Sequence, residues 1–177
     1  MRLSVTKLLG YLVPLASLAA VVHCGGGGGG GFIGAAIVSI NLSPSVIDTG
    51  DRTQIETWIS EVHENGIILK FRYPAGLTYV RDTAILEANE QQLDIGPAKN
   101  VASGNYRYLV FFFTREQFGE DNYGKLTFQL EGKAVVADGK VEVDADVDDP
   151  LIDNSVEFDP RNPEFVAEDE AGIKVRG

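Results

Sequence analysis

The chain has 177 residues, and its 26 acidic and 15 basic side chains give a formal net charge of -11. This acidic balance excludes nucleic acids and anionic lipid headgroups as natural partners, because both are themselves negatively charged. The single cysteine excludes an intramolecular disulfide. One of the two histidines lies in the N-terminal apolar segment, so the Cys/His ligands for a zinc site are too few.

The N-terminal segment has the charge pattern of an export signal. Arg2 and Lys7 are followed by an uncharged, largely apolar run over residues 8–22. Such a run would rise about 22 Å as a helix, less than the roughly 30 Å hydrocarbon thickness of a bilayer. We therefore expect residues 1–23 to be a signal peptide rather than a permanent membrane span.

A cysteine and seven glycines come directly after this run, in the order Val21-Val22-His23-Cys24 and then Gly25 to Gly31. The pattern resembles a bacterial lipoprotein signal, in which the cysteine is diacylated on sulfur and becomes the mature N-terminus. The resemblance implies lipid attachment at Cys24, anchoring to the membrane, and an outer-membrane or cell-surface location. The alternative is ordinary cleavage after Ala19 or Ala20, which leaves Cys24 as a free thiol. Residues 24–34 are predicted to form a flexible tether with a reach of about 20 Å.

The first half of the body is a series of short stretches rich in β-favouring residues, with no sustained helical period. A turn is predicted at Asn65-Gly66, where an Asn-Gly pair tolerates positive φ. Lys70 and Arg72 alternate with apolar residues, so the strand that contains them is expected to have one buried and one solvated face. The predicted strands are residues 37–42, 53–60, 67–73, 77–81 and 83–88.

The second half continues the β pattern. Residues 106–114 are apolar on both faces from Leu109 onward, as in a strand in the middle of a sheet. Residues 115–124 allow at most one helical turn before an alternating strand at 125–132. Asp138-Gly139 separates two β-favouring stretches, residues 133–137 and 140–147, and predicts a hairpin turn. A last strand is expected near Gly172 to Arg176.

These elements predict an all-β fold, an immunoglobulin-like two-sheet β-sandwich of about eight or nine strands. The sandwich is expected to comprise residues 35–177, after the signal peptide (1–23) and the tether (24–34). Its C-terminal segment, from about residue 142 to 177, is acidic but also contains apolar residues such as Phe158, Phe165 and Ile173. This segment is therefore expected to dock on the sandwich.

Three stretches of the chain carry a family resemblance: Asp48-Thr49-Gly50-Asp51-Arg52-Thr53, Glu64-Asn65-Gly66, and Tyr73-Pro74-Ala75-Gly76-Leu77-Thr78-Tyr79-Val80. Together they resemble the immunoglobulin-like conserved repeat domain of bacterial surface proteins, over about residues 45–114. Gly124 to Phe128 and Asp138-Gly139 are similar to cohesin-like modules, which are also sandwiches. Both resemblances imply binding or spacing rather than catalysis.

Trp58 is the candidate residue for partner binding. Strict alternation places it on the same strand face as Gln54 and Glu56, which would make the single tryptophan of the chain face solvent. Exposed aromatic side chains form platforms for sugars and peptides. The alternative is that Trp58 is packed beneath the C-terminal segment, since tryptophan is mostly buried on average.

The acidic segment suggests two interpretations. Asp144, Asp146 and Asp148 share one strand face, opposite Val143, Ala145 and Val147, which predicts an amphipathic strand whose charged side faces solvent and blocks edge pairing. The other interpretation is a calcium site, because Ca²⁺ prefers clustered carboxylates in loops. Its candidate ligands are Asp148, Asp149, Asp153 and Asp159.

No pattern in the sequence predicts an enzyme. His63 is the only histidine after the signal peptide, and the chain has no Gly-x-Ser-x-Gly sequence around a nucleophile. No catalytic residue and no cofactor other than calcium is expected. The sequence favours a lipid-anchored envelope module that binds or assembles with a protein or glycan partner. The alternatives are a passive spacer lipoprotein and a cohesin-like or carbohydrate-binding module.

Overall fold

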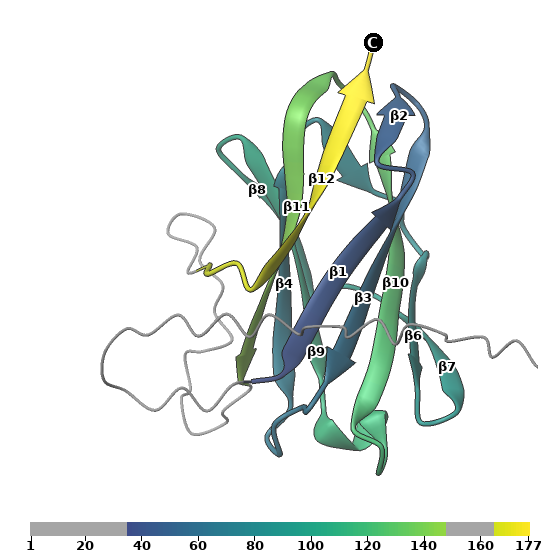
Figure 1. Cartoon of the computed structure of the whole chain (residues 1–177), viewed down its shortest axis with the longest axis vertical. Helices are drawn as coiled ribbons and strands as arrows, with labels where there is room; N and C mark the ends of the chain where they lie inside the picture. Colours follow the sequence, from purple (N-terminus) through teal and green to yellow (C-terminus); the bar gives the residue numbers. More distant parts are fainter. Residues whose placement is uncertain (1–34, 148–164) are drawn as a thin grey trace, which may run out of the picture. The chain divides into compact units, whose positions relative to one another are not determined.

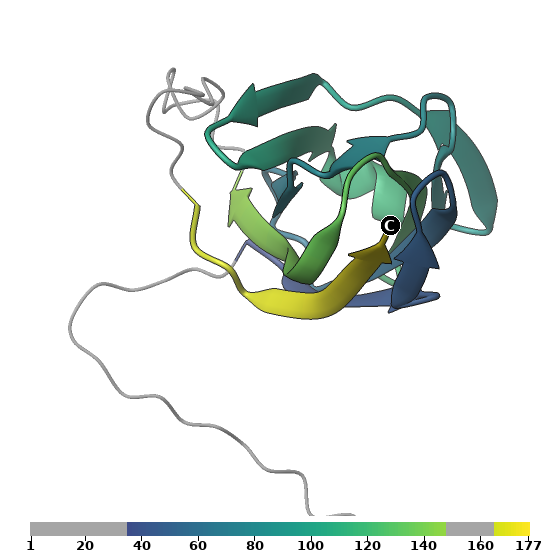
Figure 2. The same cartoon turned by 90° about the horizontal axis from the view of Figure 1, so that it is seen from above.

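The computed structural model describes residues 35–147 and 165–177. In these ranges the chain forms two β-sheets that face each other (Figures 1 and 2), with one 3-10 turn, η1 (Arg115–Phe118). The prediction of an all-β, two-sheet sandwich is confirmed. None of the described residues belongs to a helix with the length and hydrophobicity needed to cross a bilayer.

Sheet A has the strand order β1-β3-β10-β6-β7, with β5 also paired to β10, and all its pairings are antiparallel. Its longest strands, β3 and β10, pair along nearly their whole length from Tyr123 opposite Ser60 to Glu131 opposite Arg52. Its strands are β1 (Ile37–Ser43), β3 (Arg52–Ser60), β5 (Leu77–Tyr79), β6 (Ala84–Ala88), β7 (Gln91–Ile95) and β10 (Tyr123–Gly132).

Sheet B has the order β2-β12-β11-β4-β9-β8. All its pairings are antiparallel except that between β2 and β12, which is parallel. The C-terminal strand β12 is thus placed inside the sheet, beside β11 in Figure 1. Its strands are β2 (Val46–Asp48), β4 (Ile67–Pro74), β8 (Lys99–Ser103), β9 (Tyr106–Phe113), β11 (Val136–Val147) and β12 (Asp169–Arg176).

The space between the sheets is filled by the apolar residues that alternate along each strand. Ile55 and Phe128 point inward from sheet A, and Phe71 and Phe111 point inward from sheet B, all at most 1% exposed. The Phe71 and Phe128 rings meet edge to face across the sheets, with centroids 4.9 Å apart. Such pairs are preferred aromatic geometries, and they stabilise the contact between the two layers.

Three edge strands, β2, β7 and β8, were absent from the sequence prediction, and the described residues contain twelve strands rather than eight or nine. β2 has only three residues, and β7 and β8 contain no fully buried residue. β7 continues the β6 hairpin at one edge of sheet A, and β8 lies at one edge of sheet B. Without an apolar face, their sequences carry little of the alternation by which strands are predicted.

The predicted hairpin at Asp138-Gly139 is wrong, because these residues lie within the continuous strand β11. The register between β11 and β12 shifts here, from Val136 opposite Val175 to Gly139 opposite Ile173. Between these pairs, two residues of β11 face one residue of β12, which is the geometry of a β-bulge. A Cβ atom at Gly139 would lie 2.6 Å from Val136 Cγ1 and 2.8 Å from Pro74 Cγ. The glycine thus permits close packing at the bulge rather than a reversal of the chain.

Candidate functional site

A row of five side chains crosses the outer face of sheet A around Trp58. Trp58 on β3 is paired with Lys125 on β10, and Lys125 is paired with Glu87 on β6. The row continues to Gln92 on β7 and, in the other direction, to Ser39 on β1. Directly paired residues project to the same face, so this row forms a continuous surface on sheet A.

The surface around Trp58 is hollowed into a groove of about 470 Å³. Trp58 is half-buried at one side, and Tyr123, two residues before Lys125 on the same face, is 49% exposed. This volume is in the range of small-ligand pockets, roughly 300 to 1,000 Å³. We call it the Trp58 groove; its lining is Trp58, Glu87, Ala88, Asn89, Glu90, Gln91, Gln92, Asp121, Tyr123 and Lys125.

One wall of the Trp58 groove is the two-residue turn between β6 and β7. Asn89 and Glu90 both have positive φ, 49° and 57°, as a type I′ hairpin turn requires. The Asn89 side chain packs on Gly119, where an added Cβ would lie 2.4 Å from Asn89 Oδ1. The turn is therefore supported by the segment after η1, and the wall has a defined position.

Polar contacts orient the floor of the groove. Lys125 Nζ lies 2.9 Å from Glu87 Oε2, and Gln92 Nε2 donates a hydrogen bond of 3.1 Å to Glu87 Oε1. The Glu87 carboxylate raises the pKa of Lys125 through this hydrogen bond. Among the described residues, none forms a hydrogen bond with the Trp58 indole N–H.

The sequence placed Trp58 on the outer face of its strand, and this is what the structure shows. Among the described residues, the β6–β7 hairpin and Tyr123 border the tryptophan, and the described part of the C-terminal segment belongs to sheet B. The alternative of Trp58 packed beneath that segment also involves residues 148–164, which lie outside the described residues. A role of Trp58 in partner binding stays a prediction. The groove itself was not predicted, because Gln91 and Gln92 lie on β7, a strand that the sequence did not predict.

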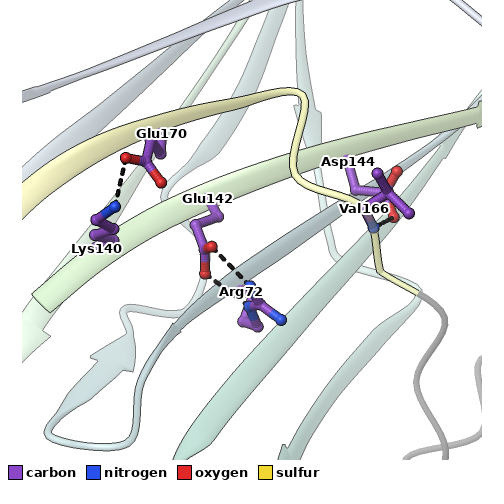
Figure 3. Close-up of polar contacts among 6 residues, drawn as sticks. All are labelled: Arg72, Lys140, Glu142, Asp144, Val166 and Glu170. Carbon is purple, nitrogen blue, oxygen red and sulfur yellow. Dashed lines mark hydrogen bonds and ion pairs between the residues drawn. The ribbon is translucent and has the colours of Figure 1, made fainter. Parts of the chain in front are cut away.

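The outer face of sheet B carries a ladder of ion pairs (Figure 3). Arg72 on β4 binds Glu142 on β11 through two hydrogen bonds, of 2.6 and 2.7 Å, and Lys140 binds Glu170 on β12 at 2.6 Å. Lys70 on β4 contacts both Asp144, at 3.0 Å, and Asp146. Burial opposes a charged Lys70, but hydrogen bonds and attraction from the two aspartates raise its pKa.

Residues 165–168, which we call the strap, cover part of this face. The Phe165 ring lies over the Arg72 guanidinium at 4.4 Å, and the Val166 N–H donates a hydrogen bond of 3.1 Å to Asp144 Oδ2 (Figure 3). On this face Asp144 and Lys70 are only 4% and 6% exposed. The prediction of a solvated face is therefore wrong for Lys70 and for Asp144, whereas the Arg72 side chain is 27% exposed. β11 also lies between β12 and β4, so its carboxylates are not at a sheet edge and do not block edge pairing there.

Glu168, at the end of the strap, has the most perturbed acidity among the described carboxylates. Partial burial, and then repulsion from Asp144 and Asp146, raise its pKa to about 7. At neutral pH this carboxyl is therefore close to half-protonated. Burial and the two neighbouring aspartates both disfavour the charged form of this carboxyl.

The remaining predicted sites lie elsewhere. Cys24 and the calcium candidates Asp148, Asp149, Asp153 and Asp159 are outside the described residues, and lipid attachment and calcium binding stay predictions. Within the described ranges, no three His, Cys, Asp or Glu side chains are grouped so that they could hold a metal ion. His63 lies in the β3–β4 turn, where its Nδ1 accepts a hydrogen bond from the Asn65 N–H.

Solved structures with a similar fold include bacterial surface proteins. The N-terminal domain of the Streptococcus gordonii adhesin Sgo0707 matches with a TM-score of 0.51 and 10% identity, over 78% of this chain and 32% of that chain. The T6 backbone pilin of serotype M6 Streptococcus pyogenes matches with a TM-score of 0.48 and 11% identity, over 80% of this chain and 36% of that chain. A non-cellulosomal cohesin from the archaeon Archaeoglobus fulgidus matches with a TM-score of 0.45 and 12% identity, over 79% of this chain and 91% of that chain.

This chain therefore spans about a third of the length of the two streptococcal structures. No protein-family model matches the sequence, and no curated protein matches it. The chain has an immunoglobulin-like β-sandwich fold. At these identities the comparison shows the fold alone, and one sandwich architecture serves many unrelated functions.

Proposed function

We propose that the chain is a lipid-anchored protein of the bacterial envelope or cell surface, whose immunoglobulin-like sandwich binds or assembles with a partner and has no catalytic role. The Cys24 pattern supports the anchor, and the immunoglobulin-like fold supports a module of the adhesin and cohesin type. The observation that carries the binding role is the groove on sheet A, with Trp58 half-buried and Tyr123 exposed at its surface. Tryptophan and tyrosine are enriched among residues that dominate binding energies.

The binding role is tested with the full-length protein immobilised at several densities and exposed to solubilised envelope proteins and glycans. A specific partner should give saturable binding that Trp58→Ala or Tyr123→Ala weakens at least about tenfold, a typical loss at a binding hot spot. The matched control is Tyr106→Ala, another exposed tyrosine, which lies on β9 of sheet B. Absence of any saturable partner would favour the passive spacer.

The anchor is tested separately, by intact-mass and acyl-chain analysis of the protein purified from its native membrane. A diacylated Cys24 at the mature N-terminus should be found, and Cys24→Ser should release the protein from the membrane fraction. An unmodified N-terminus after Ala19 or Ala20 would contradict the anchor and leave the binding role untouched.

A further inference from the structure

The charges around the Trp58 groove are unbalanced. Glu87, Glu90 and Asp121 contribute carboxylates, and Lys125 is the single cation of the lining. The Lys125 ammonium is already bound to Glu87. Glu90 and Asp121 are exposed and form no ion pair with the described residues. Two negative charges at the groove are thus left without a cation among the described residues.

The aromatic residues add a second preference for positive charge. An ammonium or guanidinium group is attracted to the face of a tryptophan or tyrosine ring, and tryptophan is the strongest of these partners. Trp58 and Tyr123 also offer apolar surface for the methylene stem of a lysine or arginine side chain. The same groove therefore suits both parts of a long basic side chain.

The wall of the groove is held in place before any ligand arrives. The Asn89-Glu90 turn is a tight two-residue connection, and Asn89 is packed against Gly119. Glu90 is thereby carried on a supported turn, while Asp121 lies in the loop before β10. A preformed site binds with less loss of conformational entropy than one that must order on binding.

From these features we propose that the Trp58 groove binds an arginine or lysine side chain presented by an extended segment of a partner protein. Glu90 and Asp121 face its charge, and Trp58 and Tyr123 contact its stem. This inference rests on the proposed binding function and names the chemistry of the partner. A neutral sugar is disfavoured as the occupant, because its hydroxyl groups would leave the charges of Glu90 and Asp121 uncompensated.

The experiment uses the fact that Trp58 is the only tryptophan of the chain, so fluorescence excited selectively in tryptophan reports on the groove. The full-length protein is titrated with a hexapeptide of alternating arginine and glycine. A saturable change in Trp58 emission is expected, and it should weaken strongly between 50 and 500 mM salt, because exposed charges are screened. The same peptide with citrulline, a neutral isostere, in place of arginine should give no saturable change.

The carboxylates are tested with a double variant, Glu90→Gln with Asp121→Asn, which should weaken peptide binding about tenfold. The matched control is Glu64→Gln with Asp138→Asn, which removes the same charges from exposed sites outside the groove. Each variant should retain the emission spectrum of the unmodified protein before peptide is added, as a check on folding around Trp58.

Three outcomes would overturn the inference. These are equal responses to the arginine and citrulline peptides, a double variant that binds like its control, and a saturable response to chitotetraose that exceeds the peptide response. The remaining case is a partner that binds the immobilised protein and is not displaced by the arginine peptide. That result would overturn only the proposal that the groove binds a basic side chain, and the proposed binding function would stand.

Discussion

Arg72 and Glu142 form a two-point ion pair between neighbouring strands, with Nε to Oε2 at 2.6 Å and Nη2 to Oε1 at 2.7 Å. They are opposite each other in the β4–β11 register, and their side chains are 27% and 11% exposed. The Phe165 ring covers the guanidinium from the strap. One ion pair thus joins two strands of sheet B to the segment that crosses them.

Removing the charge of Glu142 should lower the free energy of unfolding much more than removing an exposed charge of the same ladder. We expect Glu142→Gln to cost about 2 kcal/mol, because it leaves the half-covered Arg72 without its carboxylate. The control is Lys140→Gln, whose pair with Glu170 is about half exposed on both sides and should contribute little, because water screens it. Urea unfolding followed by Trp58 fluorescence measures both, and equal losses would contradict the prediction.

Lys70 allows a sharper comparison, because its two aspartate partners differ in burial. The Asp144 side chain is 5% exposed and that of Asp146 is 52% exposed. In double-mutant cycles, Lys70→Met should couple to Asp144→Asn by more than about 1 kcal/mol and to Asp146→Asn by less, since water screens the second pair. Similar coupling energies for the two aspartates would show that the strap does not shield Asp144.

The raised pKa of Glu168 predicts how stability depends on pH. Its pKa is about 7 in the folded chain against an ordinary value of 4.5, so between these values the folded state holds a proton that the unfolded chain releases. The contribution of Glu168 is fully present below about pH 4.5 and is lost as pH rises through 7. Relative to the unmodified protein, Glu168→Gln should therefore become progressively more stable between pH 4.5 and 7.5.

Thermal unfolding at several pH values measures the difference in Tm between Glu168→Gln and the unmodified protein. Taking this difference cancels the contributions of the other titrating groups. The control is Glu170→Gln, two residues further on and paired with Lys140 at the surface. The difference in Tm for Glu170→Gln should change little across the same interval. A constant offset in Tm for Glu168→Gln would contradict the raised pKa.

The bulge in β11 gives a prediction on backbone packing. Gly139→Ala should destabilise the fold by about 1 to 3 kcal/mol, because the new Cβ would overlap Val136 and Pro74. Gly172, on the adjacent strand, has no atom within 4 Å of an added Cβ, so Gly172→Ala should be neutral or slightly stabilising. Chemical denaturation distinguishes the two variants, and a tolerated Gly139→Ala would mean that the bulge can relax.

The strands with an apolar face were predictable, because alternation is a local property of the sequence. β3 and β10 were predicted within two residues of their observed bounds, and β4, β9 and the final strand were also predicted. Asp138-Gly139 shows the limit of a local pattern. The dipeptide suits a hairpin turn as well as a bulge, and the choice depends on the packing of Val136, Pro74 and Ile173 around Gly139.

The environment of the charged residues could not be predicted, because it depends on residues distant in the sequence. Alternation places Lys70, Arg72 and Asp144 on the outer faces of their strands, as observed. The strap, more than twenty residues beyond Asp144, contacts Arg72 and Asp144. Trp58 is similar: its face was predictable, whereas the groove beside it required the unpredicted hairpin of β6 and β7.

The position of β12 determines when sheet B can be completed. This strand lies between β2 and β11, and Lys174 pairs with Val46 across 128 positions of sequence. Until residues 169–176 are free to pair, β2 has no paired strand in sheet B and one edge of β11 is unpaired. A ribosome or translocon that holds these residues would therefore delay the completion of sheet B. Contacts of such long range slow folding. A chain crossing a membrane N-terminus first would therefore stay open to proteases and chaperones until these residues emerge.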